Sequence, residues 1–301
     1  MKIAVDIASV SKSYGAVQAV RDVSFTLRSG VVALVGHNGA GKTTLMKLML
    51  GLIRPTAGEV RVLGENPAAG QFLARRRLGY LPENVAFNAA LTGKETLAFY
   101  ARLKREPVDK ALTLLERVGL GSAGTRRVGT YSKGMRQRLG LAQALLGEPE
   151  VLLLDEPTTG LDPALRVQFY DIIQDLAATG ATVLMSSHAL SELEERTERV
   201  IIMDGGRVVV DGAIDELREI ARLPVRFRVR PGPASLSLPV EFRPRAETKL
   251  DTVEFDVPAL RKMEVLQSLI CRDRPPTDVE VIPPSLDALY AHFLNDRGHA
   301  S

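Results

Sequence analysis

Residues 36–43 carry the first pattern with clear chemical meaning, a glycine-rich segment that fits G-x-x-x-x-G-K-[ST]. It lies between an apolar run, expected to be a buried strand, and a stretch of helical period. Its glycines allow backbone N–H groups to close around phosphates, and the helix start adds partial positive charge. We expect Lys42 to reach the β- and γ-phosphates of a nucleotide and Thr43 to bind Mg²⁺. The predicted phosphate-binding residues are Gly36, His37, Asn38, Gly39, Ala40, Gly41, Lys42, Thr43 and Thr44, among which His37 fills a free position and needs no catalytic role.

Two later strand ends carry further groups that suit nucleotide hydrolysis. Asp155 and Glu156 follow the apolar run V-L-L-L, at the edge where open α/β sheets bind ligands. We expect Asp155 to hold Mg²⁺ through water and Glu156 to act as general base toward the attacking water. His188 ends the next apolar run, where a neutral imidazole can sense the γ-phosphate. Each feature alone also fits an ordinary strand end, but their order after the phosphate loop favours catalysis.

The segment Y-S-K-G-M-R-Q-R, residues 131–138, suggests a second surface that faces phosphate. Ser132 can cap the following helix, and Gly134 permits close approach of the backbone to a ligand. Taken alone, the segment favours a simple capped helix start. If both surfaces belong to one ATPase, a single copy carries two half-sites and needs a partner.

Bulk composition narrows the class of protein. The 301 residues carry 39 basic and 36 acidic side chains, interspersed, with no tryptophan, so we expect no nucleic-acid partner. Cys271 is the single cysteine, which suits a reducing compartment. No apolar stretch approaches the length that spans a bilayer, so we expect a cytoplasmic chain whose membrane role comes through a partner. Four histidines and one cysteine do not make a soft-metal site, and Met46 and Met49 are expected to be core residues.

The predicted elements give an α/β fold with a mostly parallel, doubly wound sheet. Strands are expected at 3–10, 20–27, 31–35, 59–63, 151–154, 181–186 and 200–203, with helices at 43–52, 163–179 and 215–222. A helical insertion is expected at about 84–147. Residues 223–301 are expected to form a small α+β domain of accessory or regulatory role, with strands at 225–230, 252–257 and 279–282. In it, Arg226, Arg228 and Arg230 share one strand face, either solvated or a regulatory or dimer contact.

Over residues 3–222 the chain resembles the nucleotide-binding subunit of ABC transporters. Matches follow the order of that family's motifs: Tyr14, the phosphate loop, Leu81-Pro82-Glu83, the 131–135 segment, Asp155-Glu156, Gly160-Leu161-Asp162 and His188. The resemblance implies a P-loop NTPase fold with an antiparallel β edge. It also implies that Tyr14 stacks on adenine, that Glu83 takes part in holding Mg²⁺, and that Asp162 links two sites.

The resemblance further implies an assembly. Two copies sandwich two ATP molecules head to tail, each touching the phosphate loop of one copy and Ser132 and Gly134 of the other. The homodimer drives an integral membrane permease at the cytoplasmic face of the inner membrane. Two departures stand out: Glu83 replaces the usual glutamine, and three of the five residues of the usual L-S-G-G-Q differ. As an anion, Glu83 makes binding more dependent on the metal.

Longer phrases, including L-G-Y-L-P-E-N-V and L-P-V-R-F-R-V-R, are similar to the ATPase of the nitrous-oxide reductase maturation system. That family works with a permease and a periplasmic partner to supply copper–sulfur centres. An ABC exporter for another substrate, a soluble ABC ATPase and a kinase-like phosphate-loop enzyme stay as alternatives.

Overall fold

The computed structural model describes residues 2–69, 73–188, 190–230, 252–271 and 275–298. They fall into two compact units, Met1–Gly212 and Ala213–Ser301. Within the described part, no helix is long and apolar enough to cross a membrane.

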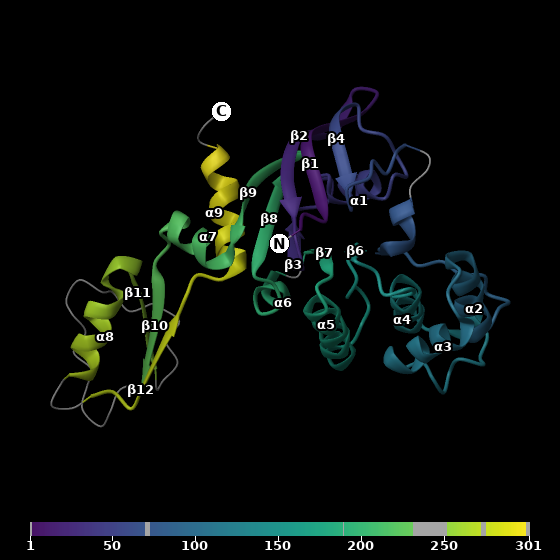
Figure 1. The fold of residues 1–301 in the computed structure, drawn as a ribbon. Helices are drawn as coiled ribbons and strands as arrows, with labels where there is room; N and C mark the ends of the chain where they lie inside the picture. The colour runs from purple at the N-terminus through teal and green to yellow at the C-terminus, as the bar shows by residue number, and fades with distance from the viewer. Residues whose placement is uncertain (1, 70–72, 189, 231–251, 272–274, 299–301) are drawn as a thin grey trace. The chain divides into compact units, whose positions relative to one another are not determined.

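A six-stranded sheet forms the centre of the first unit (Figure 1). Its order is β5 (Leu78–Leu81), β6 (Val151–Leu154), β7 (Thr182–Ser187), β3 (Gly30–Val35), β8 (Arg199–Asp204) and β9 (Arg207–Ala213). The five strands from β5 to β8 are parallel, whereas β9 follows β8 through the Gly205-Gly206 turn. Every residue of β6 and β7 is buried, as expected for strands covered on both faces.

A second, antiparallel sheet has the order β2 (Val17–Leu27), β1 (Val5–Tyr14) and β4 (Ala57–Val62). β1 and β2 continue as a hairpin to a turn at Gly15, whose φ of 57° suits glycine. The strands are therefore longer than the apolar pattern predicts, because the polar segment before Gly15 still pairs with β2. This sheet is the antiparallel β edge that the family resemblance implied.

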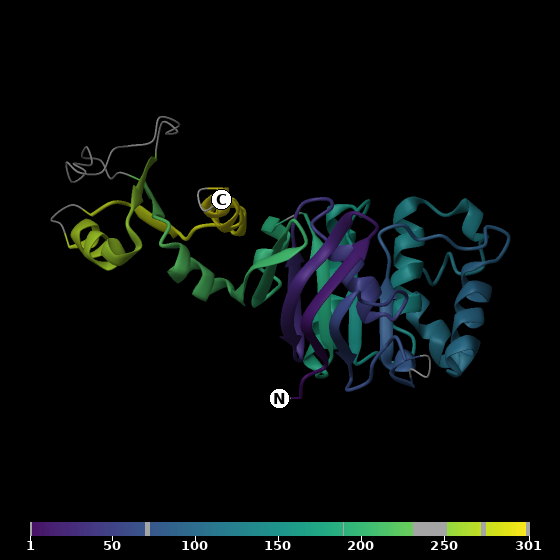
Figure 2. The ribbon, with the colours of Figure 1, turned by 90° about the horizontal axis from the view of Figure 1, so that it is seen from above.

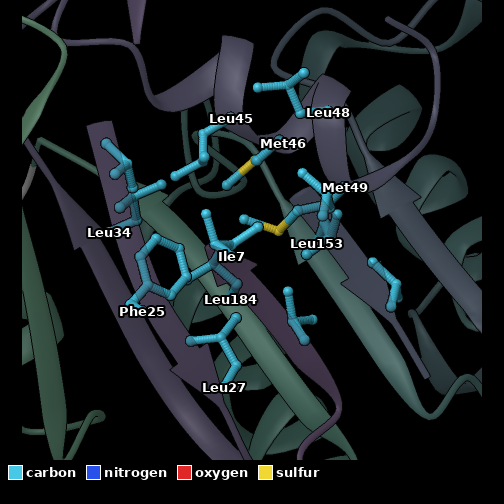
Figure 3. Close-up of a cluster of buried hydrophobic side chains, with 14 of the residues drawn as sticks. Ile7, Phe25, Leu27, Leu34, Leu45, Met46, Leu48, Met49, Leu153 and Leu184 are labelled. Carbon is cyan, nitrogen blue, oxygen red and sulfur yellow. The ribbon is translucent and has the colours of Figure 1, made fainter. Parts of the chain in front are cut away.

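The core between the two sheets is filled by α1 (Lys42–Met49), the helix that follows the phosphate loop. Met46 and Met49 are fully buried among side chains of both sheets, including Ile7 and Leu34 (Figure 3). Their predicted role as core residues is confirmed. The packing fixes the direction of α1 and therefore the position of its first turn.

Helices α2 (Gly93–Lys104), α3 (Val108–Arg117) and α4 (Lys133–Ala144) pack together beside the main sheet (Figure 2). A capping box starts α2, where Thr92 accepts from the Glu95 N–H and the Glu95 side chain accepts from the Thr92 N–H. The remaining helices of this unit are α5 (Pro163–Ala178), α6 (Leu190–Glu194) and the short 3₁₀ turns Leu73–Arg77 and Val128–Thr130.

The second unit holds a three-stranded antiparallel sheet in the order β11 (Val253–Val257), β10 (Val225–Arg230) and β12 (Asp278–Ile282). α8 (Lys262–Ile270) contributes Val265 and Leu269 to a core around Phe227 and Phe255. The other helices are α7 (Ile214–Ala221), α9 (Leu286–Gly298) and the 3₁₀ turn Ala259–Arg261. Because α7 contacts α9, this unit begins at Ala213, earlier than the sequence boundary.

The arginine face of β10 is paired with acids on the neighbouring strands. Arg228 lies 2.6 Å from both Glu254 and Glu280, and Arg226 lies within 4.0 Å of Glu254 and Asp256. The positive charges of Arg226 and Arg228 are thus balanced within the sheet.

Candidate functional site

The phosphate loop connects β3 to α1 and is held tightly by its glycines. A Cβ on Gly36 would lie 2.5 Å from the Met203 carbonyl oxygen, and one on Gly41 would lie 2.5 Å from that of Ala19. Gly41 precedes the helix with a φ of 104°, and no side chain caps the first turn. The first N–H groups of α1 can therefore bind an anion, as the motif predicts.

Lys42 is buried, and its ammonium folds back over the loop. Nζ donates to the carbonyl oxygens of Gly36 at 2.5 Å and His37 at 3.2 Å. Burial lowers the pKa of Lys42, while the nearby carboxylates of Glu156, Asp155 and Glu83 oppose that shift. The two carbonyl oxygens are thus partners that phosphate oxygens can replace when a nucleotide binds.

Asp155 is 2% exposed and joins three elements. Its Oδ2 accepts from Thr43 Oγ1 at 2.7 Å, and its Oδ1 accepts from Ser186 Oγ at 2.8 Å. Ser186 Oγ in turn accepts from the Glu156 N–H at 3.0 Å. The sequence pattern singled out Thr43 and Asp155 but missed Ser186, whose role depends on the parallel pairing of β6 with β7. Hydroxyl and carboxylate oxygens are the donors that Mg²⁺ prefers, so this pair fits the metal.

Glu156 and His188 meet directly. His188 Nδ1 donates to Glu156 Oε2 at 2.6 Å. Glu156 Oε1 is buried, and no described residue gives it a hydrogen bond. The Glu156 backbone has a φ of 48°, in the left-handed region, which costs a non-glycine residue about 1–3 kcal/mol. A carboxylate oriented by an imidazole and holding an unpartnered oxygen suits proton abstraction.

Lys42, Thr43, Asp155 and Glu156 border an open pocket of about 660 Å³, and His188 contacts this lining through Glu156. Its described lining is Tyr14, Val17, Gln18, Ala19, Arg21, His37, Asn38, Gly39, Ala40, Gly41, Lys42, Thr43, Thr44, Glu83, Asp155, Glu156 and Gly205. Tyr14 is half-exposed, and Lys12 Nζ lies 5.1 Å from the centroid of its ring. The sequence did not predict Gly205 or the four lining residues of β2 (Val17, Gln18, Ala19 and Arg21). They reach the pocket because β2 lies against the β8–β9 turn, where the Arg21 N–H donates to the Gly206 carbonyl at 2.7 Å.

His37 ties the loop to the end of β8. Its two ring nitrogens lie 2.7 Å from the Asn38 carbonyl oxygen and 2.7 Å from Asp204 Oδ1. The hydrogen bond to Asn38, and next that to Asp204, raise the pKa of His37. The His37 side chain thus has one partner in the loop and one at the end of β8.

Ser132, Gly134 and Asp162 are not part of the pocket lining described above. Ser132 is exposed and caps α4, where its Oγ accepts from the Met135 N–H at 3.2 Å. Asp162 is also exposed and caps α5 by accepting from the Leu165 N–H at 3.0 Å. A Cβ on Gly134 would lie 3.3 Å from the Gly160 carbonyl oxygen, so the two helix starts are neighbours. Two other predicted residues, the buried Gly36 and the exposed His188, are also absent from that lining. The structure thus places the phosphate-loop residues from His37 onward around the pocket with Tyr14, Glu83, Asp155 and Glu156, and leaves Ser132 and Asp162 exposed outside it.

Tyr131 replaces the leucine that usually opens this segment, and it lies in the interior. It is 3% exposed, and its hydroxyl donates to the Ala123 carbonyl at 2.8 Å. The departure therefore changes the packing beneath the segment, while Ser132 and Lys133 stay exposed.

Comparison with known proteins places these features in a family. A family model described as ABC transporter matches residues 20–159. The chain is 34% identical to the daunorubicin resistance ATP-binding protein DrrA3 of Streptomyces coeruleorubidus, over 97% of this chain and 96% of that one. It is 44% identical to the ABC transporter ATP-binding protein YxlF of Bacillus subtilis (strain 168), which is described as uncharacterised, over 71% of this chain and 72% of that one.

Solved structures of the same family have the same fold as this chain. The structure of an ATP-binding subunit of an ABC transporter is 31% identical and superposes with a TM-score of 0.68, over 73% of this chain and 93% of that one. A bacterial ABC transporter cassette solved as a dimer shows the same fold, with 23% identity and a TM-score of 0.65, over 70% of this chain and 98% of that one. The chain belongs to the ATP-binding subunits of ABC transporters, enzymes that hydrolyse ATP.

Proposed function

We propose that this chain works as a homodimer that closes on two ATP molecules and drives a membrane permease in export. One observation carries the proposal: the pocket gathers Lys42, Asp155 and Glu156 within one copy, while Ser132 lies exposed outside it, next to the partly buried Gly134. A second copy placed head to tail would bring its Ser132 to the open side of the pocket. A cassette of the same fold has been solved as a dimer, which supports the pairing of two copies.

In this proposal the charged residues of the pocket, Tyr14 and the neighbouring His188 have separate roles in binding and hydrolysing ATP. Lys42 leaves the loop carbonyls for the β- and γ-phosphates, and the N–H groups of the loop bind the same oxygens. Mg²⁺, held by Thr43 and Asp155 with Glu83 nearby, would supply charge compensation for the triphosphate. Glu156 accepts the proton of the attacking water, and His188 holds Glu156 in position and senses the γ-phosphate. Tyr14 stacks on the adenine.

The permease would dock on the helical region. Phe87, Tyr100 and Phe99 form a chain of edge-to-face rings, with centroids 5.9 Å and 5.3 Å apart. Phe99 and Leu103 are 50% and 64% exposed. An exposed apolar surface of this kind suits a short membrane-protein helix. This surface lies on α2 and on the segment after Glu83. A displacement of the surface by the permease could therefore be passed through that segment to Glu83 in the pocket.

The names of two relatives indicate what kind of compound the permease could transport. One relative is a daunorubicin resistance protein, and another, 38% identical over 70% of this chain and 69% of that one, is a Nod factor export protein of Rhizobium johnstonii. These names favour export of a small organic compound over import. A role in nitrous-oxide reductase maturation, with a periplasmic partner and copper cargo, finds no support among the named relatives and stays an untested prediction.

Purification from membranes tests the proposal. The tagged chain should be recovered from the cytoplasmic face of the inner membrane with a multi-span permease, and ATP hydrolysis by the complex should exceed that of the chain alone. Recovery of a free protein without a permease would favour a soluble ABC ATPase. Stimulation of hydrolysis by daunorubicin would support export, whereas stimulation by copper ions alone would support the maturation role.

A further inference from the structure

Arg166 and Tyr170 lie one helical turn apart on α5 and form a polar cluster that the proposed mechanism does not use. Arg166 Nε donates to the Leu161 carbonyl at 3.0 Å, and its Nη1 pairs with Glu192 Oε1 on α6. The Tyr170 hydroxyl donates to the other oxygen of Glu192, at 3.3 Å. One guanidinium thus binds two separate segments at once.

The cluster contacts segments next to Glu156, Asp162 and His188. α6 begins two residues after His188, and Leu161 directly precedes Asp162. The Tyr170 phenol also interacts with the side chain of Thr158, two residues after Glu156. Burial, and next the negative charge of Glu192, raise the pKa of Tyr170 to about 12, so the phenol stays a donor.

The same loop is tied to the helix that Ser132 opens. Gln137 is 2% exposed, and its Nε2 donates to the Pro157 carbonyl at 3.1 Å. Movement at the start of α4 can therefore reach the loop after Glu156, and from there the cluster. The route runs through directed hydrogen bonds, which tolerate little displacement.

We propose that Arg166 is a positioning residue that couples the His188 segment to the Leu161–Asp162 turn. The proposal rests on the proposed function, because it assigns roles to His188 and Asp162. The fork of the guanidinium is essential: it donates to a backbone carbonyl and a carboxylate together, while a lysine ammonium or a reversed ion pair preserves at most part of this geometry. Arg166 does not line the pocket, so its loss should affect turnover and not ATP affinity.

The experiment measures kcat and KM for ATP, with the thermal midpoint, in four variants of the full chain. Arg166→Gln and Glu192→Gln each break the ion pair. The double variant Arg166→Glu with Glu192→Arg restores an ion pair between α5 and α6, but its residue 166 has no donor for Leu161. Arg117→Gln is the matched control, since it breaks the pair with Asp175 that joins the same helix to α3.

We expect Arg166→Gln to lower kcat about ten- to a hundredfold, the scale of a small misplacement of catalytic groups, with KM unchanged. The reversed pair should recover the thermal midpoint but not kcat, and Arg117→Gln should keep kcat. Full recovery of kcat by the reversed pair, or normal kcat in Arg166→Gln, would overturn the inference. The proposed function fails by a different result, namely a Glu156→Gln variant that hydrolyses ATP normally.

Discussion

The pocket around Lys42 and the surface around Ser132 belong to one unit but differ in how complete they are. In the pocket, side chains from α1, from β7 and from the residues that follow β6 and β7 bond to one another: Asp155 accepts from both Thr43 and Ser186, and Glu156 accepts from His188. On the surface, Ser132 and Asp162 only cap their own helices and face outward. In the proposed function, the pocket binds a nucleotide within a single copy, whereas the surface acquires a chemical role only against a second copy.

The largest loss of ATP hydrolysis is expected from a change of Glu156 in the pocket. Glu156→Gln keeps the shape of the side chain but removes the basic oxygen, so ATP hydrolysis should fall about 10²–10⁴-fold. ATP binding should persist, and ATP-bound pairs should accumulate. Hydrolysis assays and size-exclusion chromatography with ATP check both points. Normal turnover would remove Glu156 from the mechanism.

The surface is tested by Ser132→Arg, which places bulk and charge where the second copy is proposed to bind. Nucleotide binding by a single chain should stay unchanged, while hydrolysis should fall to background. The variant also loses a helix cap, worth about 0.5–2 kcal/mol. Thr92→Arg is the matched control, because it removes the cap of α2 and should keep hydrolysis. Equal loss in both variants would mean that only stability is affected.

Tyr14 tests how the pocket binds the base. Tyr14→Ala should weaken ATP binding by about 1–3 kcal/mol, or roughly 5- to 150-fold, because a stacking partner is lost. Tyr14→Phe keeps the ring and should bind ATP as the wild type does. The measurement is the dissociation constant of each variant for ATP. Equal affinity of the alanine variant would place the adenine elsewhere.

The smallest expected effect concerns Glu83. Without Mg²⁺, Glu83→Gln should bind ATP about fivefold more tightly than the wild type, since one negative charge near the phosphates is worth about 1 kcal/mol. With Mg²⁺ the difference should shrink. Calorimetric titrations with and without the metal compare the two proteins. A wild type that binds ATP equally well in both conditions would contradict this role.

Most of the fold could be predicted from periodicity, and the exceptions have physical causes. Strands such as β3 and β6 are continuous apolar runs, and the helices show apolar residues at regular spacing. β5 was missed because it has four residues and contains Gly79, a position where a Cβ would lie 2.2 Å from the Ala144 carbonyl. β9 was missed because its residues are only partly buried at the sheet edge.

The pocket was predictable where chemistry is encoded in neighbouring residues, as in 36–43 and in Asp155-Glu156. Ser186 and Arg21 were not, because their positions arise from pairing between segments far apart in sequence. The contact between Arg166 and Glu192 is of the same kind. Sequence motifs thus identify the groups that react, while the groups that position them emerge only with the fold.

The composite site is tested most directly by mixing two inactive variants, Lys42→Ala and Ser132→Arg. Each alone should be unable to hydrolyse ATP, because each of its two sites lacks one essential residue. In a mixed pair, the intact pocket of the Ser132→Arg copy faces the intact Ser132 of the Lys42→Ala copy. If chains pair at random, roughly a quarter of the sites become complete, and hydrolysis should reappear on mixing. A mixture as inactive as its components, under conditions where the wild type hydrolyses ATP, would contradict the composite site.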